Sequence, residues 1–146
     1  MNGCKKGQAA AEFLAVFGFL LLVFVVVQIV LLDSRNSAEE ERQAIFAEKF
    51  VRGVASKINL VSESPGFETR FEVTRGLGEQ ALAYTLTLSN SSASVSYNYG
   101  GALKSAAAPV RASRLNNGSG AQAFNLSTIG AYRVNNTRGV VYVVPA

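Results

Sequence analysis

The feature that most constrains this chain is an uninterrupted apolar stretch near its N-terminus. Residues 13–32 carry no charged side chain, and only Gly18 and Gln28 interrupt the aliphatic and aromatic residues. As an α-helix, these 20 residues span about 30 Å at about 1.5 Å per residue, the thickness of the hydrocarbon core of a bilayer. A surface helix of a soluble protein is apolar on one stripe rather than around its whole circumference. We therefore expect this segment to spend part of its existence in lipid.

The flanking charges predict the orientation of that segment. Lys5 and Lys6 precede it, whereas Asp33 follows it directly. Basic residues concentrate on the cytoplasmic side of a membrane helix, so we expect the N-terminus inside and the rest of the chain outside, on a single-pass protein of the cell membrane. An ordinary secretory signal is cut at small residues after its apolar core. Here the small residues come before the core, which argues against that kind of processing.

The start of the chain resembles the class III signal peptides of archaeal type IV pilin-like proteins. The residues that carry the resemblance are Lys5, Lys6, Gly7, Gln8 and Glu12, followed by the apolar helix. The resemblance implies that a prepilin-type peptidase cuts between Gly7 and Gln8, which makes Glu12 the fifth residue of the mature chain. Many relatives carry Ser at the position of Ala10. Bacterial TadE-like minor pilins begin in a similar way, so the motif identifies a superfamily rather than one branch.

The position of Glu12 at the edge of the apolar helix also has an electrostatic explanation. A carboxylate at the edge of an apolar helix costs several kcal/mol unless it is neutralised or paired. Cleavage before Gln8 creates an α-amino group about one helical turn from Glu12. In a bundle of parallel helices, the amine of one copy can pair with Glu12 of the next and so fix the axial register through Gln8 and Glu12. The alternative is that Glu12 extends to the lipid headgroups of a permanent membrane anchor.

Composition argues against two classes of function. The net charge is +4, and removal of a leader containing two lysines leaves 12 basic against 10 acidic residues. Without a cluster of Lys and Arg, we expect no nucleic-acid partner. The sequence has no histidine, and its one cysteine, Cys4, lies in the predicted leader. We therefore predict no disulfide in the mature domain, no metal site, no cofactor and no enzyme activity.

Residues 33–64 are predicted to continue the helix as an amphipathic segment. The polar residues 33–37 either cap a second helix or kink a continuous one, and residues 64–66 (Ser-Pro-Gly) end it. Glu48 and Arg52 have the spacing of an i,i+4 ion pair. An apolar stripe repeats every four residues and is expected to support a β domain; its members are Phe46, Phe50, Val54 and Ile58.

After residue 66 the apolar period changes from near 3.6 to 2, which indicates β-strands. The clearest strands are predicted at residues 67–73, 82–88 and 94–99, with a hairpin joining the last two. Four tyrosines could form a binding platform, but their spacing favours packing in the core or at an interface: Tyr84, Tyr97, Tyr99 and Tyr132.

The last third of the sequence has a weaker pattern. Residues 106–109 are predicted as a turn, residues 110–115 as a weak edge strand and residues 116–120 as a loop. A second hairpin is predicted from strands at residues 129–134 and 140–144. The expected domain is one antiparallel sheet of about five or six strands.

The predicted fold class is α+β, with a long hydrophobic and amphipathic helix followed by a small antiparallel β-sheet domain, as in type IV pilins. The expected segments are a leader peptide (1–7), a transmembrane or filament-core helix (8–32), its amphipathic continuation (33–64) and an extracellular β domain (65–146).

Four Asn-x-Ser/Thr sequons are candidates for N-linked glycans on the extracellular side. Three of them, Asn90, Asn117 and Asn135, fall in predicted turns or loops, and Asn125 lies beside a predicted strand. The alternative is that these asparagines serve only the solubility of the surface.

These patterns favour a structural subunit of an extracellular type IV pilus-like filament, serving adhesion. Its expected partners are copies of itself, the prepilin peptidase, the membrane during biogenesis, and a pilus assembly ATPase and platform. The alternatives are a single-pass, membrane-anchored surface binding protein and a minor, initiating pseudopilin.

Overall fold

A single long helix comes first in the chain and is followed by two small β-sheets. The computed structural model describes residues 3–78, 81–120, 123–126 and 129–146. Helix α1 runs from Gly3–Glu63 without interruption, so the polar residues 33–37 neither end it nor begin a second helix. The chain divides into two compact units, Met1–Glu40 and Glu41–Ala146. The first unit is helical throughout its described length, whereas the second joins the C-terminal part of α1 to all the described strands.

The second unit contains eight strands among the described residues. They are β1 (Glu68–Val73), β2 (Tyr84–Ser89), β3 (Ser92–Tyr99), β4 (Ala102–Pro109), β5 (Leu115–Asn116), β6 (Ala123–Leu126), β7 (Gly130–Thr137) and β8 (Val140–Pro145). They form two four-stranded sheets, with the orders β1-β7-β8-β5 and β4-β3-β2-β6. All pairs are antiparallel except β5 with β8, which is parallel. The α+β class is confirmed, but the single antiparallel sheet of five or six strands was wrong.

Both sheets and the last turns of α1 share one apolar core. Burial alternates along the strands, so that one face of each sheet is apolar and the other is wet. The helix contributes a buried stripe that includes Val51, Val54, Ile58 and Val61. Phe46 remains 37% exposed and Phe50 is only partly buried. The predicted stripe was therefore correct at its C-terminal end and wrong at Phe46, because the sheets meet the helix on a face turned towards Val51.

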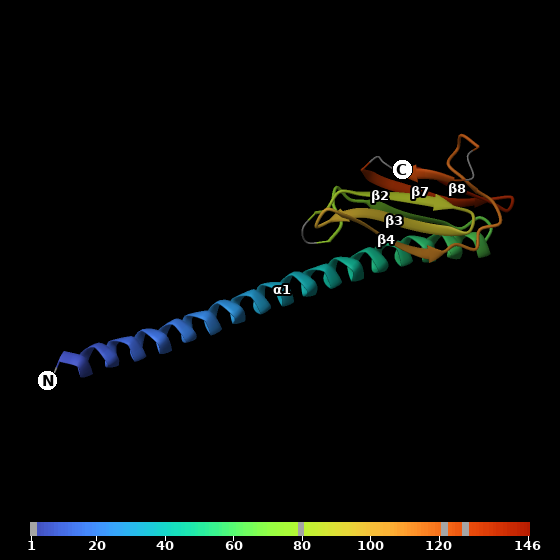
Figure 1. Ribbon diagram of the computed structural model, residues 1–146. Coiled ribbons are helices and arrows are strands. Elements are labelled where there is room, and N and C mark those ends of the chain that lie inside the picture. Colours follow the sequence, from blue (N-terminus) through green and yellow to red (C-terminus); the bar gives the residue numbers. More distant parts are fainter. Residues whose placement is uncertain (1–2, 79–80, 121–122, 127–128) are drawn as a thin grey trace. The chain divides into compact units, whose positions relative to one another are not determined.

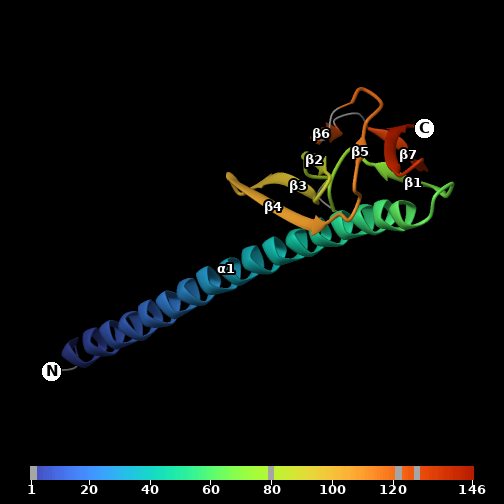
Figure 2. The same cartoon turned by 90° about the vertical axis from the view of Figure 1, so that its right-hand side faces the viewer.

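The C-terminal end of β4 lies beside the helix in Figures 1 and 2, and β1 lies beside it in Figure 2. Asn59 accepts a hydrogen bond from the backbone N–H of Arg111 (2.7 Å) and donates one to the carbonyl of Pro109 (3.2 Å). Lys57 Nζ donates to the carbonyl of Arg70 in β1 (2.7 Å). The other two edges are the short strands β5 and β6. Short edge strands, and side chains that bond to the backbone of an edge strand, both reduce the pairing of a sheet with other chains.

Tight turns explain where the predictions of the last third failed. Gly100 and Gly101 both have positive φ (60° and 81°), which suits a two-residue hairpin turn. This turn sends the chain straight back as β4, so residues 106–109 belong to a strand and not to a turn. Residues 110–114 then form no strand, and only Leu115–Asn116 pairs with β8.

The C-terminal hairpin is confirmed but has a shorter connection than expected. Its turn consists of Arg138 (φ 55°) and Gly139 (φ 81°). Strand β7 therefore continues to Thr137, and Asn135 lies inside the strand rather than in a loop.

Candidate functional site

The largest exposed apolar surface belongs to the first unit. All large apolar side chains of residues 13–32 are at least 41% exposed. Within the described residues, one helix is long and apolar enough to cross a membrane. Its most apolar 18-residue stretch has a mean hydropathy of 3.1 and contains no buried residue. Exposed apolar surface of this extent is unstable in water and needs lipid or protein around it. This segment is therefore the first candidate for a functional surface.

The predicted processing residues lie on α1, directly before that surface. Lys5, Lys6, Gly7 and Gln8 have helical backbone, and their side chains lie outside the described residues. Glu12 is exposed on the next turn. The rings of Phe13 and Phe17 stack one turn further on, with centroids 6.2 Å apart and planes at 15°. Continuous helix thus separates Gln8 from Glu12 by about one turn, as the register hypothesis requires.

Two of the sequons lie in a bend and a loop, as expected from the sequence, and their glycosylation stays a prediction. Asn90 lies in the bend between β2 and β3, and Asn117 in the loop after β5. The Oδ1 of Asn90 accepts a hydrogen bond from the N–H of Leu115 (2.7 Å), which ties β5 to this bend. The Oδ1 of Asn117 accepts bonds from the N–H and the hydroxyl of Ser119, the third residue of its own sequon (3.0 and 2.6 Å).

The other two sequons lie in strands. Asn125 is exposed on β6, an edge strand, and its Oδ1 accepts a hydrogen bond from the hydroxyl of Thr87 (2.7 Å). The third residue of this sequon lies outside the described residues. Asn135 lies in β7 between β1 and β8, opposite Glu68 and Tyr142. Its Oδ1 is buried without a hydrogen-bond partner, so the expectation that it belongs to an accessible loop was wrong.

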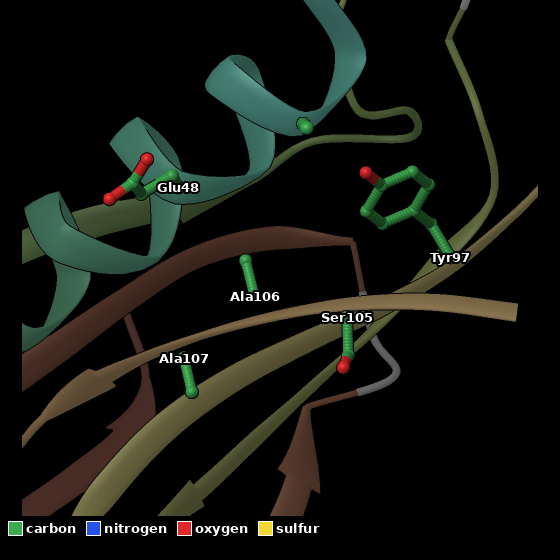
Figure 3. A pocket seen from close by; sticks show the side chains of 6 residues that line it. Glu48, Tyr97, Ser105, Ala106 and Ala107 are labelled. Carbon is green, nitrogen blue, oxygen red and sulfur yellow. The ribbon is translucent and has the colours of Figure 1, made fainter. Parts of the chain in front are cut away.

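A cavity of about 290 Å³ lies between α1 and β4. Its walls include Glu48 from the helix, Tyr97 from β3 and Ala106 from β4. Figure 3 shows that the methyl group of Ala106 points towards the helix, whereas Ser105 points away from the cavity. Glu48 forms the predicted ion pair with Arg52 (2.5 Å), and both side chains are at least half exposed. The remaining lining residues, Ala44, Ser105 and Ala107, are small, which leaves the space between α1 and β4 unfilled.

The described residues supply no metal-binding cluster either. They contain no group of three or more His, Cys, Asp or Glu side chains that could hold a metal ion. Comparisons with protein-family models, with curated proteins and with solved structures found no match. A function for this chain must therefore be inferred from its own residues.

Two features were missed by sequence reasoning. One is a groove beside Gly53, for which a glycine in the middle of a helix was the available signal. The other is Asn136, whose buried amide bonds to the end of α1. No local pattern could have found the second, because the partners are 75 residues apart.

Proposed function

We propose that this chain is the precursor of a structural subunit of an extracellular filament of the type IV pilin-like class. The observation that carries the proposal is the exposed apolar helix of residues 13–32, which begins one residue after the exposed Glu12. Lipid covers this surface before assembly, and neighbouring copies of the helix cover it in a filament. Glu12 then favours one axial offset between neighbouring copies, because every other offset leaves a carboxylate unpaired in an apolar bundle, which is costly.

The second unit supports the proposal by being self-contained. Its core is drawn from both sheets and from helix residues 47–61, and side chains of the helix bond to the backbone of both long edge strands, β1 and β4. A domain of this kind stays folded at the end of a helix while that helix exchanges lipid for protein neighbours. In the proposal, the β domain forms the outer surface that serves adhesion and carries any N-linked glycans.

The proposed sequence of events requires three partners besides the chain itself. A prepilin peptidase removes residues 1–7 while the membrane holds the helix, and an assembly ATPase with its platform extracts the mature chain. The deciding experiment is N-terminal sequencing of protein from native membranes and from sheared filaments. The expected N-terminus is Gln8. An intact Met1 on a protein that is monomeric in detergent contradicts the proposal and favours a membrane-anchored binding protein.

The number of copies distinguishes a main subunit from a minor, initiating pseudopilin. Quantitative mass spectrometry of sheared filaments measures this number relative to the other filament proteins. Processed chain at a few copies per filament supports the minor role, and processed chain as the dominant species supports the main one.

A further inference from the structure

A groove of about 240 Å³ opens on the second unit where α1 passes β1. We call it the Gly53 groove. Its lining residues are Lys49, Phe50, Gly53, Val54, Lys57, Phe71 and Glu72. Each aromatic residue of the lining packs against a tyrosine outside it. Phe50 packs edge-on against Tyr84, with ring centroids 5.3 Å apart, and Phe71 stacks on Tyr132, with ring centroids 5.7 Å apart. The groove therefore has a firm apolar floor with charged residues along its sides.

Gly53 leaves the helix surface open in this groove. A Cβ added to Gly53 would have no neighbour within 4 Å, so nothing within the chain demands a glycine there. Alanine in its place would favour the helix, because glycine is the poorer helix former. A glycine that the lone chain does not need, in a groove with an apolar floor, permits the close approach of another backbone.

The charge around the groove favours an acidic occupant. Lys49 and Lys57 stand one turn before and one turn after Gly53, on the same side of the helix. The Lys57 amino group is anchored by its hydrogen bond to the carbonyl of Arg70 (2.7 Å). Glu72 is the acidic member of the lining. The lining therefore carries two positive charges and one negative charge.

We propose that the Gly53 groove receives the acidic turn of residues 39–41 from α1 of a second copy of this chain. This turn contains three consecutive glutamates, Glu39, Glu40 and Glu41, and it complements the two lysines in charge. The inference rests on the proposed function, because it requires copies with their helices side by side. A single chain cannot make the contact, since Glu41 and Lys49 are eight residues apart on one helix, about 12 Å along its axis.

The steric test uses the full chain expressed in its native host. Gly53→Leu fills the groove, and Ser56→Leu adds the same side chain at an exposed helix position outside the groove lining. We expect sheared-filament yield to fall about fivefold or more for Gly53→Leu and to stay near wild type for Ser56→Leu. Gly53→Ala should raise the Tm of the detergent-solubilised chain, because alanine favours the helix, yet lower the filament yield. Stabilisation combined with weaker assembly excludes misfolding as the cause.

The electrostatic test exchanges charges across the proposed contact. Lys49→Glu and Glu41→Lys should each lower filament yield about fivefold, the effect of a surface ion pair at the strong end of its range. The double variant should recover most of that loss, because the restored pair joins two different chains. A double variant no better than the singles overturns the inference, and so does a Gly53→Leu variant that assembles like wild type. Failure of the wild-type chain to form filaments overturns the proposed function instead.

Discussion

The buried side-chain amide of Asn136 donates a hydrogen bond to the carbonyl oxygen of Val61, at 3.1 Å. The same nitrogen donates to the carbonyl of Ser62 (3.1 Å), and the Oδ1 accepts from the N–H of Gly139 (3.0 Å). The last carbonyls of a helix have no partner within the helix. A strand residue therefore completes the end of α1 and at the same time holds the β7–β8 turn.

Asn136→Ala should lower the free energy of unfolding by about 1–3 kcal/mol, because it removes the donor to the Ser62 carbonyl and one of two donors to the Val61 carbonyl, which also accepts from the N–H of Ser64 (3.3 Å). Asn136→Asp should cost more, since it keeps the acceptor for Gly139 but places a negative charge at the negative end of the helix dipole. Thermal and denaturant unfolding of the full chain in detergent measures both. The control is Asn98→Ala on the exposed face of β3, expected within about 0.5 kcal/mol of wild type. Equal effects at residues 98 and 136 contradict the prediction.

Ala106→Val should stabilise the chain by about 0.5–2 kcal/mol by filling part of the cavity between α1 and β4. The half-buried Ala106 points into that cavity, and the exposed Ala107 does not (Figure 3). Ala107→Val is the matched control, because it makes the same change in strand propensity without filling the gap. A larger rise in Tm for Ala106→Val than for Ala107→Val supports the prediction. A rise no larger than that of the control contradicts it.

Glycans, where they are attached, should favour two of the four sequons. Asn117 lies in a loop and Asn125 is exposed on a sheet edge, whereas Asn90 supports β5 and Asn135 lies within β7. Mass spectrometry of peptides from native protein measures the occupancy of each site. Ser119→Ala removes the Asn117 sequon and should abolish a glycan mass, whereas Thr137→Ala at the Asn135 sequon should change nothing. Occupancy at Asn135 above that at Asn117 would reverse this ranking.

How much of the fold the sequence predicts depends on whether the signal is local. The long helix, β1, the β2–β3 hairpin and the C-terminal hairpin follow from local signals: an unbroken apolar run, apolar periods near 3.6 and 2, and turn residues between apolar segments. Strand β4 was missed because its alanines at residues 106–108 show no contrast between apolar and polar positions. The division into two sheets was missed because it depends on which strands pair across the chain.

The candidate site divides in the same way. The apolar residues 13–32 and Glu12 could be identified from sequence, because an unbroken apolar run with a carboxylate directly before it is a local feature. The exposure of Phe46 and the burial of Val51 depend on the angle at which the sheets meet the helix, which no sequence window contains. The Gly53 groove likewise exists only once β1 brings Phe71 next to the helix.

Glu12→Gln should separate membrane insertion from assembly. The amide keeps the size of the side chain but removes the charge that we propose pairs with the α-amino group of a neighbouring mature chain. We therefore expect normal insertion and processing, with a loss of filament yield of about tenfold, equivalent to about 1.4 kcal/mol per contact. Membrane fractionation measures insertion, N-terminal sequencing measures processing, and shearing measures assembly. The control is Glu63→Gln, an exposed glutamate at the other end of α1, which should assemble like wild type. If Glu12→Gln assembles as well as this control, the carboxylate does not set the register.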